Sequence, residues 1–457
     1  MDWQREAERR KDELLSELQE LIAIPSVLSE DGSLDAPYGT EVRKALDWFL
    51  EKGERAGFKA KNVANVAGHL EIGEGQELLG ILGHVDVVPA GDGWTKDPFG
   101  GEIADGKLYG RGAIDDKGPT IAAWMALKMV KDAGFDFKRR VRLIIGTDEE
   151  SGFRCVERYF ETEEMPGIGF APDADFPIIN AEKGIADLKY MLNFAEGGEL
   201  LEFTSGERTN MVPDHAIAHL ALDSQQVASA FQAFCENEQV TGDCQASADG
   251  TGTVLTLAGK SAHAMEPEWG VNAGILLAKF LQDKIAGDGA NFVRFIAHYF
   301  SGDSRGKKLS LDYSDEASGD TTFNAGIMSY KAGEQAAIRV SMRYSISYPF
   351  DKMMERNEID GVKMGILSNS KPHHVDADDP FIKTLQQAYE KETGEAAELL
   401  AIGGGTYARV LDKGVAFGML FPGEPDVAHQ ADEFVDIDNL VKATAIYAQA
   451  IYQLACK

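Results

Sequence analysis

One stretch decides the fold of this chain: Glu-Leu-Leu-Gly-Ile-Leu-Gly-His-Val-Asp-Val-Val-Pro-Ala-Gly-Asp-Gly, residues 77–93. Residues 77–88 form a short apolar run, which is typical of a strand that is buried on both faces. We expect the strand to end at Pro89, because proline has no backbone N–H to donate and a glycine-rich turn follows it. A second apolar run, Val141 to Gly146, ends on the polar residues 147–150, Thr-Asp-Glu-Glu.

Predicted helices lie between these strands. Apolar residues recur at helical spacing over residues 14–22, and another helix is predicted to open at Lys117 and to end near Gly134. Farther along, the pattern predicts helices around residues 381–388 and 440–454 and a buried strand between them, at 415–421. Strands that alternate with helices favour an α/β domain with a mostly parallel sheet covered by helices.

The middle of the chain differs in pattern. Short alternating segments, such as 253–257 and 337–348, and clusters of glycine, aspartate and serine indicate a second, α+β domain. We therefore predict one catalytic α/β domain, residues 1–187 and 375–457, interrupted by an inserted α+β lid domain, residues 188–374.

The composition is that of a globular protein with an acidic surface. The 457 residues include 45 basic and 75 acidic side chains, which gives a net charge of −30. So acidic a chain repels phosphate backbones and anionic lipids, and we expect no nucleic-acid and no membrane partner. No run approaches the roughly 18 apolar residues of a membrane helix, and the charged first residues lack the apolar core of a signal peptide. Four cysteines without Cys-x-x-Cys spacing favour reduced thiols and a cytoplasmic location.

His84 and Asp86 lie two residues apart at the end of the first buried strand, so their side chains can share a face. A histidine that binds metal through one ring nitrogen often donates its other N–H to a carboxylate. The alternative is an ordinary strand-end histidine held by a local acid. The adjacent acids Asp115 and Asp116 repel each other unless a positive charge, or the N-terminus of the following helix, lies nearby.

Acidic residues also follow the other predicted strands. Side chains alternate in direction along residues 148–150, so Glu149 and Glu150 need not do the same work; the alternative is a solvated acidic turn. More acids lie at 172–177, and His429 follows the last predicted strand. Because ligands gather at the carboxyl ends of parallel strands, these residues are candidates for a two-metal site, for which zinc suits the mixed nitrogen and oxygen ligands.

Five motifs follow one another along the chain: Gly-His-Val-Asp-Val-Val-Pro (83–89), Gly-Arg-Gly-Ala-Ile-Asp-Asp-Lys-Gly-Pro (110–119), Asp-Glu-Glu (148–150), Pro-Asp-Ala-Asp-Phe-Pro (172–177) and His-Gln-Ala-Asp-Glu (429–433). Their order resembles the di-zinc superfamily of aminoacylases, glutamate carboxypeptidases, desuccinylases and dipeptidases. The likeness is closest to the PepV-type dipeptidases, and it covers nearly the whole chain.

By this resemblance, His84, Asp115 and Asp173 hold one zinc ion, while His429, Glu150 and the same Asp115 hold the other. A bridging carboxylate makes physical sense because it offsets two cations that lie only about 3.5–4 Å apart. The choice of Asp173 over Asp175 rests on the spacing in the family. The resemblance also makes Asp86 the partner that orients His84, and Glu149 the general base.

The resemblance implies further roles in substrate binding. His263 is similar to the family histidine that steadies the oxyanion, and Asn210 to a polar substrate contact. Arg343 is similar to the arginine that grips the terminal carboxylate of the substrate, with nearby Arg339 as its rival. Substrate contacts are also implied for Gly405 and Thr406, in the segment Gly-Gly-Gly-Thr-Tyr-Ala-Arg.

The expected function is metal-dependent hydrolysis of dipeptides with free termini, by a zinc-dependent metallopeptidase that holds two Zn²⁺ per chain. Mn²⁺ or Co²⁺ are expected substitutes. The alternative within the same superfamily is an N-acyl-amino-acid deacylase. The PepV-like kind implies a monomer, whereas other relatives form dimers through the insert.

Overall fold

The computed structural model describes residues 1–29, 32–192, 198–248 and 250–457. The chain forms two compact units. The first comprises residues 1–181, 374–400 and 405–457, and the second comprises 182–373 and 401–404. Compared with the predicted insert, 188–374, the second unit begins six residues earlier, ends one residue earlier and also includes 401–404. These residues belong there because the Lys183 backbone N–H donates to the Ile402 carbonyl, 2.9 Å away.

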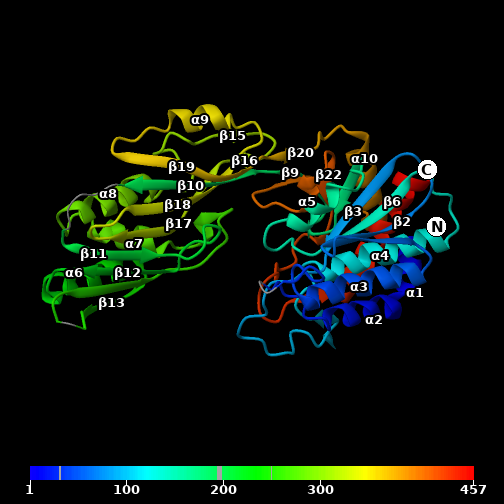
Figure 1. Cartoon of the computed structure of the whole chain (residues 1–457), viewed down its shortest axis with the longest axis horizontal. Coiled ribbons are helices and arrows are strands. Elements are labelled where there is room, and N and C mark those ends of the chain that lie inside the picture. The colour runs from blue at the N-terminus through cyan, green and yellow to red at the C-terminus, as the bar shows by residue number, and fades with distance from the viewer. Residues whose placement is uncertain (30–31, 193–197, 249) are drawn as a thin grey trace. The chain divides into compact units, whose positions relative to one another are not determined.

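The first unit is built on a mixed sheet that contains the strand order β1-β2-β6-β3-β7-β22-β9. Strands β2, β6, β3, β22 and β9 of this sheet are labelled in Figure 1. Four neighbours at its centre, β6, β3, β7 and β22, are parallel, and the flanking pairs are antiparallel. Every residue of β3 is buried, as expected for a strand covered on both faces. The strands are β1 (Lys59–Val63), β2 (Ala67–Ile72), β3 (Leu78–His84), β6 (Arg140–Gly146), β7 (Ile168–Ala171), β9 (Ile178–Glu182) and β22 (Gly414–Ala416).

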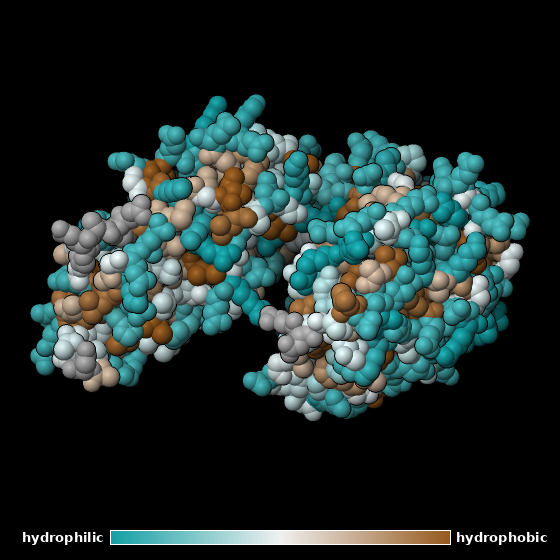
Figure 2. Space-filling model, in the orientation of Figure 1, coloured by the Kyte–Doolittle hydropathy of each residue, from teal (hydrophilic) through white to brown (hydrophobic). Residues whose placement is uncertain are grey.

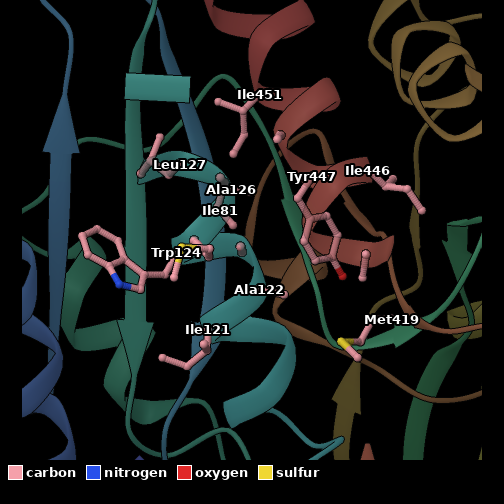
Figure 3. Close-up of a cluster of buried hydrophobic side chains, with 14 of the residues drawn as sticks. Ile81, Ile121, Ala122, Trp124, Ala126, Leu127, Met419, Ile446, Tyr447 and Ile451 are labelled. Carbon is pink, nitrogen blue, oxygen red and sulfur yellow. The ribbon is translucent and has the colours of Figure 1, made fainter. Parts of the chain in front are cut away.

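Helices of the first unit share one hydrophobic cluster with this sheet. Figure 3 shows part of the cluster, where Trp124 of α4, Ile81 of β3 and Tyr447 of α11 lie among aliphatic side chains. Helix α4 is buried along nearly its whole length because it packs between the sheet and the neighbouring helices. The helices are α1 (Trp3–Arg9), α2 (Lys11–Ile22), α3 (Thr40–Arg55), α4 (Lys117–Asp132), α5 (Arg154–Phe160), α10 (Pro380–Thr393) and α11 (Ile437–Ile451).

A small antiparallel sheet lies beside these elements, in the order β24-β5-β4. Its strands are β4 (Glu102–Ala104), β5 (Lys107–Tyr109) and β24 (Phe434–Asp436). The β5–β24 pairing holds the segment after Tyr109, which leads to Asp115, against the segment that follows His429.

The second unit is an antiparallel sheet with its own hydrophobic cluster, in the order β13-β14-β12-β11-β17-β18-β10-β19. Helix α7 packs on α8 and on β12, and α6 packs on β13. The strands are β10 (Gly184–Leu192), β11 (Leu200–Ser205), β12 (His215–Leu220), β13 (Thr241–Ala246), β14 (Thr253–Ala258), β17 (Thr322–Lys331), β18 (Ala336–Tyr344) and β19 (Val362–Ser370). The helices are α6 (Ser224–Glu238), α7 (Ala273–Leu281), α8 (Asp288–Phe300) and α9 (Phe350–Arg356).

The predicted fold class, an α/β catalytic domain with an α+β insert, is confirmed, but two predicted strands are wrong in part. The strand expected over 77–88, with its end at Pro89, ends at His84 instead. The segment 415–421 is split into β22 and a separate short strand, β23 (Met419–Leu420). Gly418, between them, has a φ of +87°, a left-handed conformation that glycine adopts without strain. Strand β23 then pairs with β8 (Ala174–Asp175) rather than continuing the main sheet.

The surface agrees with the acidic composition. Figure 2 shows hydrophilic residues over most of the visible face of each unit, with apolar residues scattered among them. Among the described residues, the helices are all too short or too polar to cross a bilayer.

Candidate metal centre

The site lies where the central parallel strands end. His84 is the last residue of β3 and pairs in register with Gly146, the last residue of β6. Glu149 and Glu150 follow β6 directly, and Asp173 follows β7. The carboxyl ends of neighbouring parallel strands meet at one edge of a sheet, which is why residues so far apart in the chain converge here.

Two groups of potential metal ligands lie at this edge, with the ligand atoms of each group within 4.8 Å of one another: His84, Asp116 and Asp173, and Asp115, Glu150 and His429. Asp115 connects them. One of its carboxylate oxygens lies 3.2 Å from His84 Nε2, and the other lies 2.9 Å from His429 Nε2. Glu150 is 3.1 Å from the same nitrogen of His429.

The residues of the site fit bound cations. His84 and Asp116 are fully buried, yet His84 Nε2 and Asp116 Oδ1 have no hydrogen-bond partner among the described residues. Buried polar atoms are costly to leave unpaired, so such atoms indicate a missing partner. Imidazole nitrogens and carboxylate oxygens together are the ligands that zinc prefers in catalytic sites.

The electrostatics of the cluster favour positive charge. Hydrogen bonds to Asp115 and Glu150 raise the pKa of His429 to about 11. Burial would raise the pKa of Asp115, but the close imidazoles of His429 and His84 outweigh burial and lower it. Carboxylates that stabilise an imidazolium this strongly also attract divalent cations.

Asp86 lies directly behind His84 and is fully buried. The His84 Nδ1 atom is 2.9 Å from the backbone carbonyl of Asp86 and 3.4 Å from its Oδ1, so the backbone oxygen is the nearer partner. The other carboxylate oxygen accepts a hydrogen bond from the Glu150 backbone N–H at 3.2 Å. Asp86 therefore links the His84 strand end to the loop that carries Glu149 and Glu150.

The three consecutive acids after β6 have different surroundings. The Asp148 carboxylate is fully buried and accepts hydrogen bonds from Arg154 Nε and Nη2, each at 2.7 Å, which fixes the turn. Glu150 belongs to one of the ligand groups, whereas Glu149 belongs to neither. Burial raises the pKa of Glu149 well above its ordinary value, and the charges of Glu150 and Asp115 add to the shift while that of His84 opposes it.

The turn after β7 holds both aspartates considered for the site. Asp173 Oδ2 lies 3.7 Å from His84 Nε2 and belongs to a ligand group; Asp175 belongs to neither group. Asp175 instead lies in β8, paired with Leu420 of β23.

Asp116 is a member of the His84 group, a position for which the sequence offered either a nearby positive charge or the N-terminus of the following helix. Its Oδ2 accepts hydrogen bonds from the His84 backbone N–H at 3.0 Å and from the Thr120 hydroxyl at 2.8 Å. In the sequence, the repulsion between the adjacent acids Asp115 and Asp116 indicated only that a positive charge or a helix N-terminus lies nearby. It did not indicate that Asp116 lies beside His84.

Gly405 and Thr406 lie at the start of the segment that packs beside His84. The Tyr407 ring lies 6.0 Å from the His84 ring, and its hydroxyl is 2.9 Å from the buried Cys155 Sγ. The Thr406 hydroxyl accepts a hydrogen bond from the Ala408 backbone N–H at 3.1 Å, so it caps the short helical turn that follows.

In the second unit, Asn210 and His263 are exposed and lie on adjoining segments. The Ala264 N–H donates to the Asn210 carbonyl at 2.9 Å, and the Val212 N–H donates to the Ala262 carbonyl at 2.8 Å. The structure therefore brings these two candidates together.

The two candidate arginines lie four residues apart on β18. The Arg343 residue is buried, whereas the Arg339 side chain is 40% exposed and forms an ion pair with Asp187. Their different surroundings make them a natural pair for mutational comparison.

An α/β unit that presents two acid–imidazole groups at the ends of its parallel strands has the architecture of a metal-dependent hydrolase. Residues 80–453 match the model of a family described as "Peptidase family M20/M25/M40". The chain belongs to this family and is a metallopeptidase.

Relatives match over the whole chain. "Putative dipeptidase YtjP" of Bacillus subtilis (strain 168) is 49% identical over 464 residues, covering 100% of both chains. "Putative dipeptidase SAB1611c" of Staphylococcus aureus (strain bovine RF122 / ET3-1) is 43% identical over 466 residues, covering 99% of each.

Solved structures share the fold. Human carnosine dipeptidase 1 matches with a TM-score of 0.57 at 17% identity, covering 99% of this chain and 98% of that one. The dipeptidase Dug1p from Saccharomyces cerevisiae matches with a TM-score of 0.56 at 15% identity, covering 98% of both.

Proposed function

We propose that this protein hydrolyses dipeptides with free termini at a centre of two divalent metal ions, with zinc the ion that the ligands suit best. The observation that carries the proposal is the pair of ligand groups at the ends of the parallel strands, connected by Asp115. His84 and Asp173, with Asp115 in place of its neighbour Asp116, would hold one ion, and Asp115, Glu150 and His429 would hold the other. The names of relatives that match over the full chain support a dipeptide substrate.

The residues of the first unit have different roles in the proposed hydrolysis. When bound, the two metals polarise the peptide carbonyl and lower the pKa of an attacking water to near neutrality. Glu149 takes the proton of that water and delivers it to the leaving amine, because it lies beside the ligands without belonging to either group. Asp86 keeps the His84 ring in orientation through Nδ1.

The proposed roles in the second unit come from the family resemblance. His263 donates to the developing oxyanion, Asn210 contacts a polar group of the substrate, and Arg343 binds its terminal carboxylate. Gly405 and Thr406 contribute further contacts to the substrate.

A substrate panel tests the proposal. Protein with its metal content measured is assayed on dipeptides, on the same dipeptides with an acetylated N-terminus, and on simple N-acyl amino acids. We expect hydrolysis of the free dipeptides and little of the blocked ones. A preference for the acylated compounds would instead make the protein a deacylase, and no turnover of any of them by metal-loaded protein would refute the proposal.

Removal of the Arg343 side chain is expected to lower kcat/KM for substrates that carry a free C-terminal carboxylate. Losing one partner of a buried charge pair costs about 2 kcal/mol or more, which is roughly a 30-fold loss of kcat/KM. Arg343→Ala is compared with wild type on dipeptides and on the corresponding dipeptide amides, which lack the charge. Arg339→Ala is the matched control, because Arg339 lies on the same strand and already pairs with Asp187. Equal losses on acids and amides, or the larger loss in Arg339→Ala, would contradict the assignment.

A further inference from the structure

Glu433 is a buried acid to which neither the sequence motifs nor the proposed mechanism gives a role. It lies four residues after His429, immediately before β24, and is 0% exposed. A carboxylate this deeply buried is costly unless it is paired and hydrogen-bonded, so its partners show what it is for.

The partners of Glu433 all belong to the segment that ends in Asp115. Its Oε1 accepts hydrogen bonds from the backbone N–H groups of Gly112 at 3.0 Å, Ile114 at 3.0 Å and Asp115 at 3.3 Å. Its Oε2 accepts a hydrogen bond from the buried Arg111 Nη1 at 2.5 Å, which pairs the two charges. The carboxylate thus sits inside a ring of donors formed by residues 111–115.

The backbone of Glu433 adds to the same link. Its carbonyl accepts a hydrogen bond from the Gly110 N–H at 2.9 Å, and the next residue, Phe434, pairs with Tyr109 of β5. The segment that carries Asp115 is therefore bound along its length to the segment that carries His429.

The neighbouring acid, Asp432, makes a different connection. Its carboxylate accepts hydrogen bonds from the Thr95 backbone N–H and hydroxyl, both at 2.8 Å, and from the Lys96 N–H at 3.3 Å. Asp432 thus ties the same segment to residues 95–96 and makes none of these bonds to the Asp115 segment.

We propose that Glu433 is a positioning residue of the metal centre, which holds the Asp115 and His429 segments in the register that lets both side chains bind the same ion. This inference rests on the proposed metal centre. Asp115 and His429 approach within 2.9 Å, and the hydrogen bonds from residues 112–115 to one oxygen of Glu433 set where the Asp115 backbone lies. Groups that orient metal ligands typically change metal affinity about 10–100-fold when they are altered.

Two substitutions separate positioning from charge pairing. Glu433→Gln keeps an oxygen at the same reach for the backbone N–H groups but loses the charge that pairs with Arg111. Glu433→Asp keeps the charge but withdraws the oxygens by one methylene. Asp432→Asn is the matched control. Metal-depleted wild type and variants are titrated with zinc by calorimetry, and the thermal unfolding of each apo-protein is followed by circular dichroism.

We expect Glu433→Asp to bind the weaker of the two zinc equivalents about 10–100-fold less tightly, and Glu433→Gln and Asp432→Asn to remain within a few-fold of wild type. The reverse order, with Gln impaired and Asp normal, would reduce Glu433 to a charge partner of Arg111 and overturn the proposal. Equal losses of zinc affinity in Glu433→Asp and Asp432→Asn would also overturn the proposal. So would unfolding of the apo-protein in either Glu433 variant. Each result would mean that the contacts of Glu433 stabilise the fold and do not position the metal ligands. If wild type itself bound no zinc, the proposed function would fail first, and the titration distinguishes the two failures.

Discussion

Removing divalent metal is expected to abolish dipeptide hydrolysis, and adding back zinc, manganese or cobalt is expected to restore it. Without cations the partly buried carboxylates of Asp115, Glu149 and Glu150 repel one another, and as acceptors they cannot polarise a peptide carbonyl. Lowering the pKa of a water from about 16 to about 7 is the contribution of metal that no side chain of this chain replaces. Protein dialysed against a chelator is assayed before and after each metal is returned, with the metal content measured at every step.

The control in this experiment is the fold of the metal-depleted protein. Circular dichroism before and after chelation shows whether lost activity reflects lost metal or lost structure, and recovery on adding metal argues for the former. Full turnover by protein that metal analysis shows to be empty would rule out the metallohydrolase mechanism altogether.

Replacing Glu149 by alanine is expected to reduce kcat by roughly 10²–10⁴-fold while leaving the bound metal unchanged. The reason is that Glu149 lies outside both ligand groups, so its loss removes a proton acceptor and not a ligand. KM for a dipeptide is expected to change little, because the carboxylate acts on the water and not on the substrate. Metal analysis and steady-state kinetics on the same preparation measure both quantities.

Glu149→Gln sharpens this test because it keeps the size of the side chain and removes only its basicity. Glu157→Ala, an exposed acid on the nearby α5, is the control for a change of surface charge. Normal turnover in Glu149→Gln would show that the base is elsewhere, and loss of metal in Glu149→Ala would make Glu149 a ligand.

The convergence of the site is the part that the sequence predicts best. Buried strands can be located from apolar runs such as 77–88 and 141–146, although the first strand ends at His84, before its run does. Parallel strands require their carboxyl ends to meet at one edge. His84, the last residue of the first strand, and Glu150, which follows the second, accordingly lie in the two ligand groups that Asp115 connects. The order of the motifs extended this reasoning to His429, which no local pattern could place near β3.

What the sequence could not supply depends on contacts between distant segments. The position of Asp116 follows from hydrogen bonds to His84 and Thr120, and that of Glu433 from a ring of donors more than 300 residues earlier in the chain. The division of 415–421 depends on the φ of Gly418, because a glycine within an apolar run does not reveal which conformation it adopts. Residues 401–404 join the second unit through a hydrogen bond to Lys183 that no local signal indicates.

The order of strands in the main sheet has a consequence for biosynthesis. β22 lies between β7 and β9, yet it is formed by residues 414–416, long after both have left the ribosome. Until then the nascent chain carries β7 with an unpaired edge, the kind of surface that recruits another strand and promotes aggregation. A polypeptide released before that point would lack both β22, which pairs with the edge of β7, and His429. An unfinished product of translation would therefore be prone to aggregate as well as inactive.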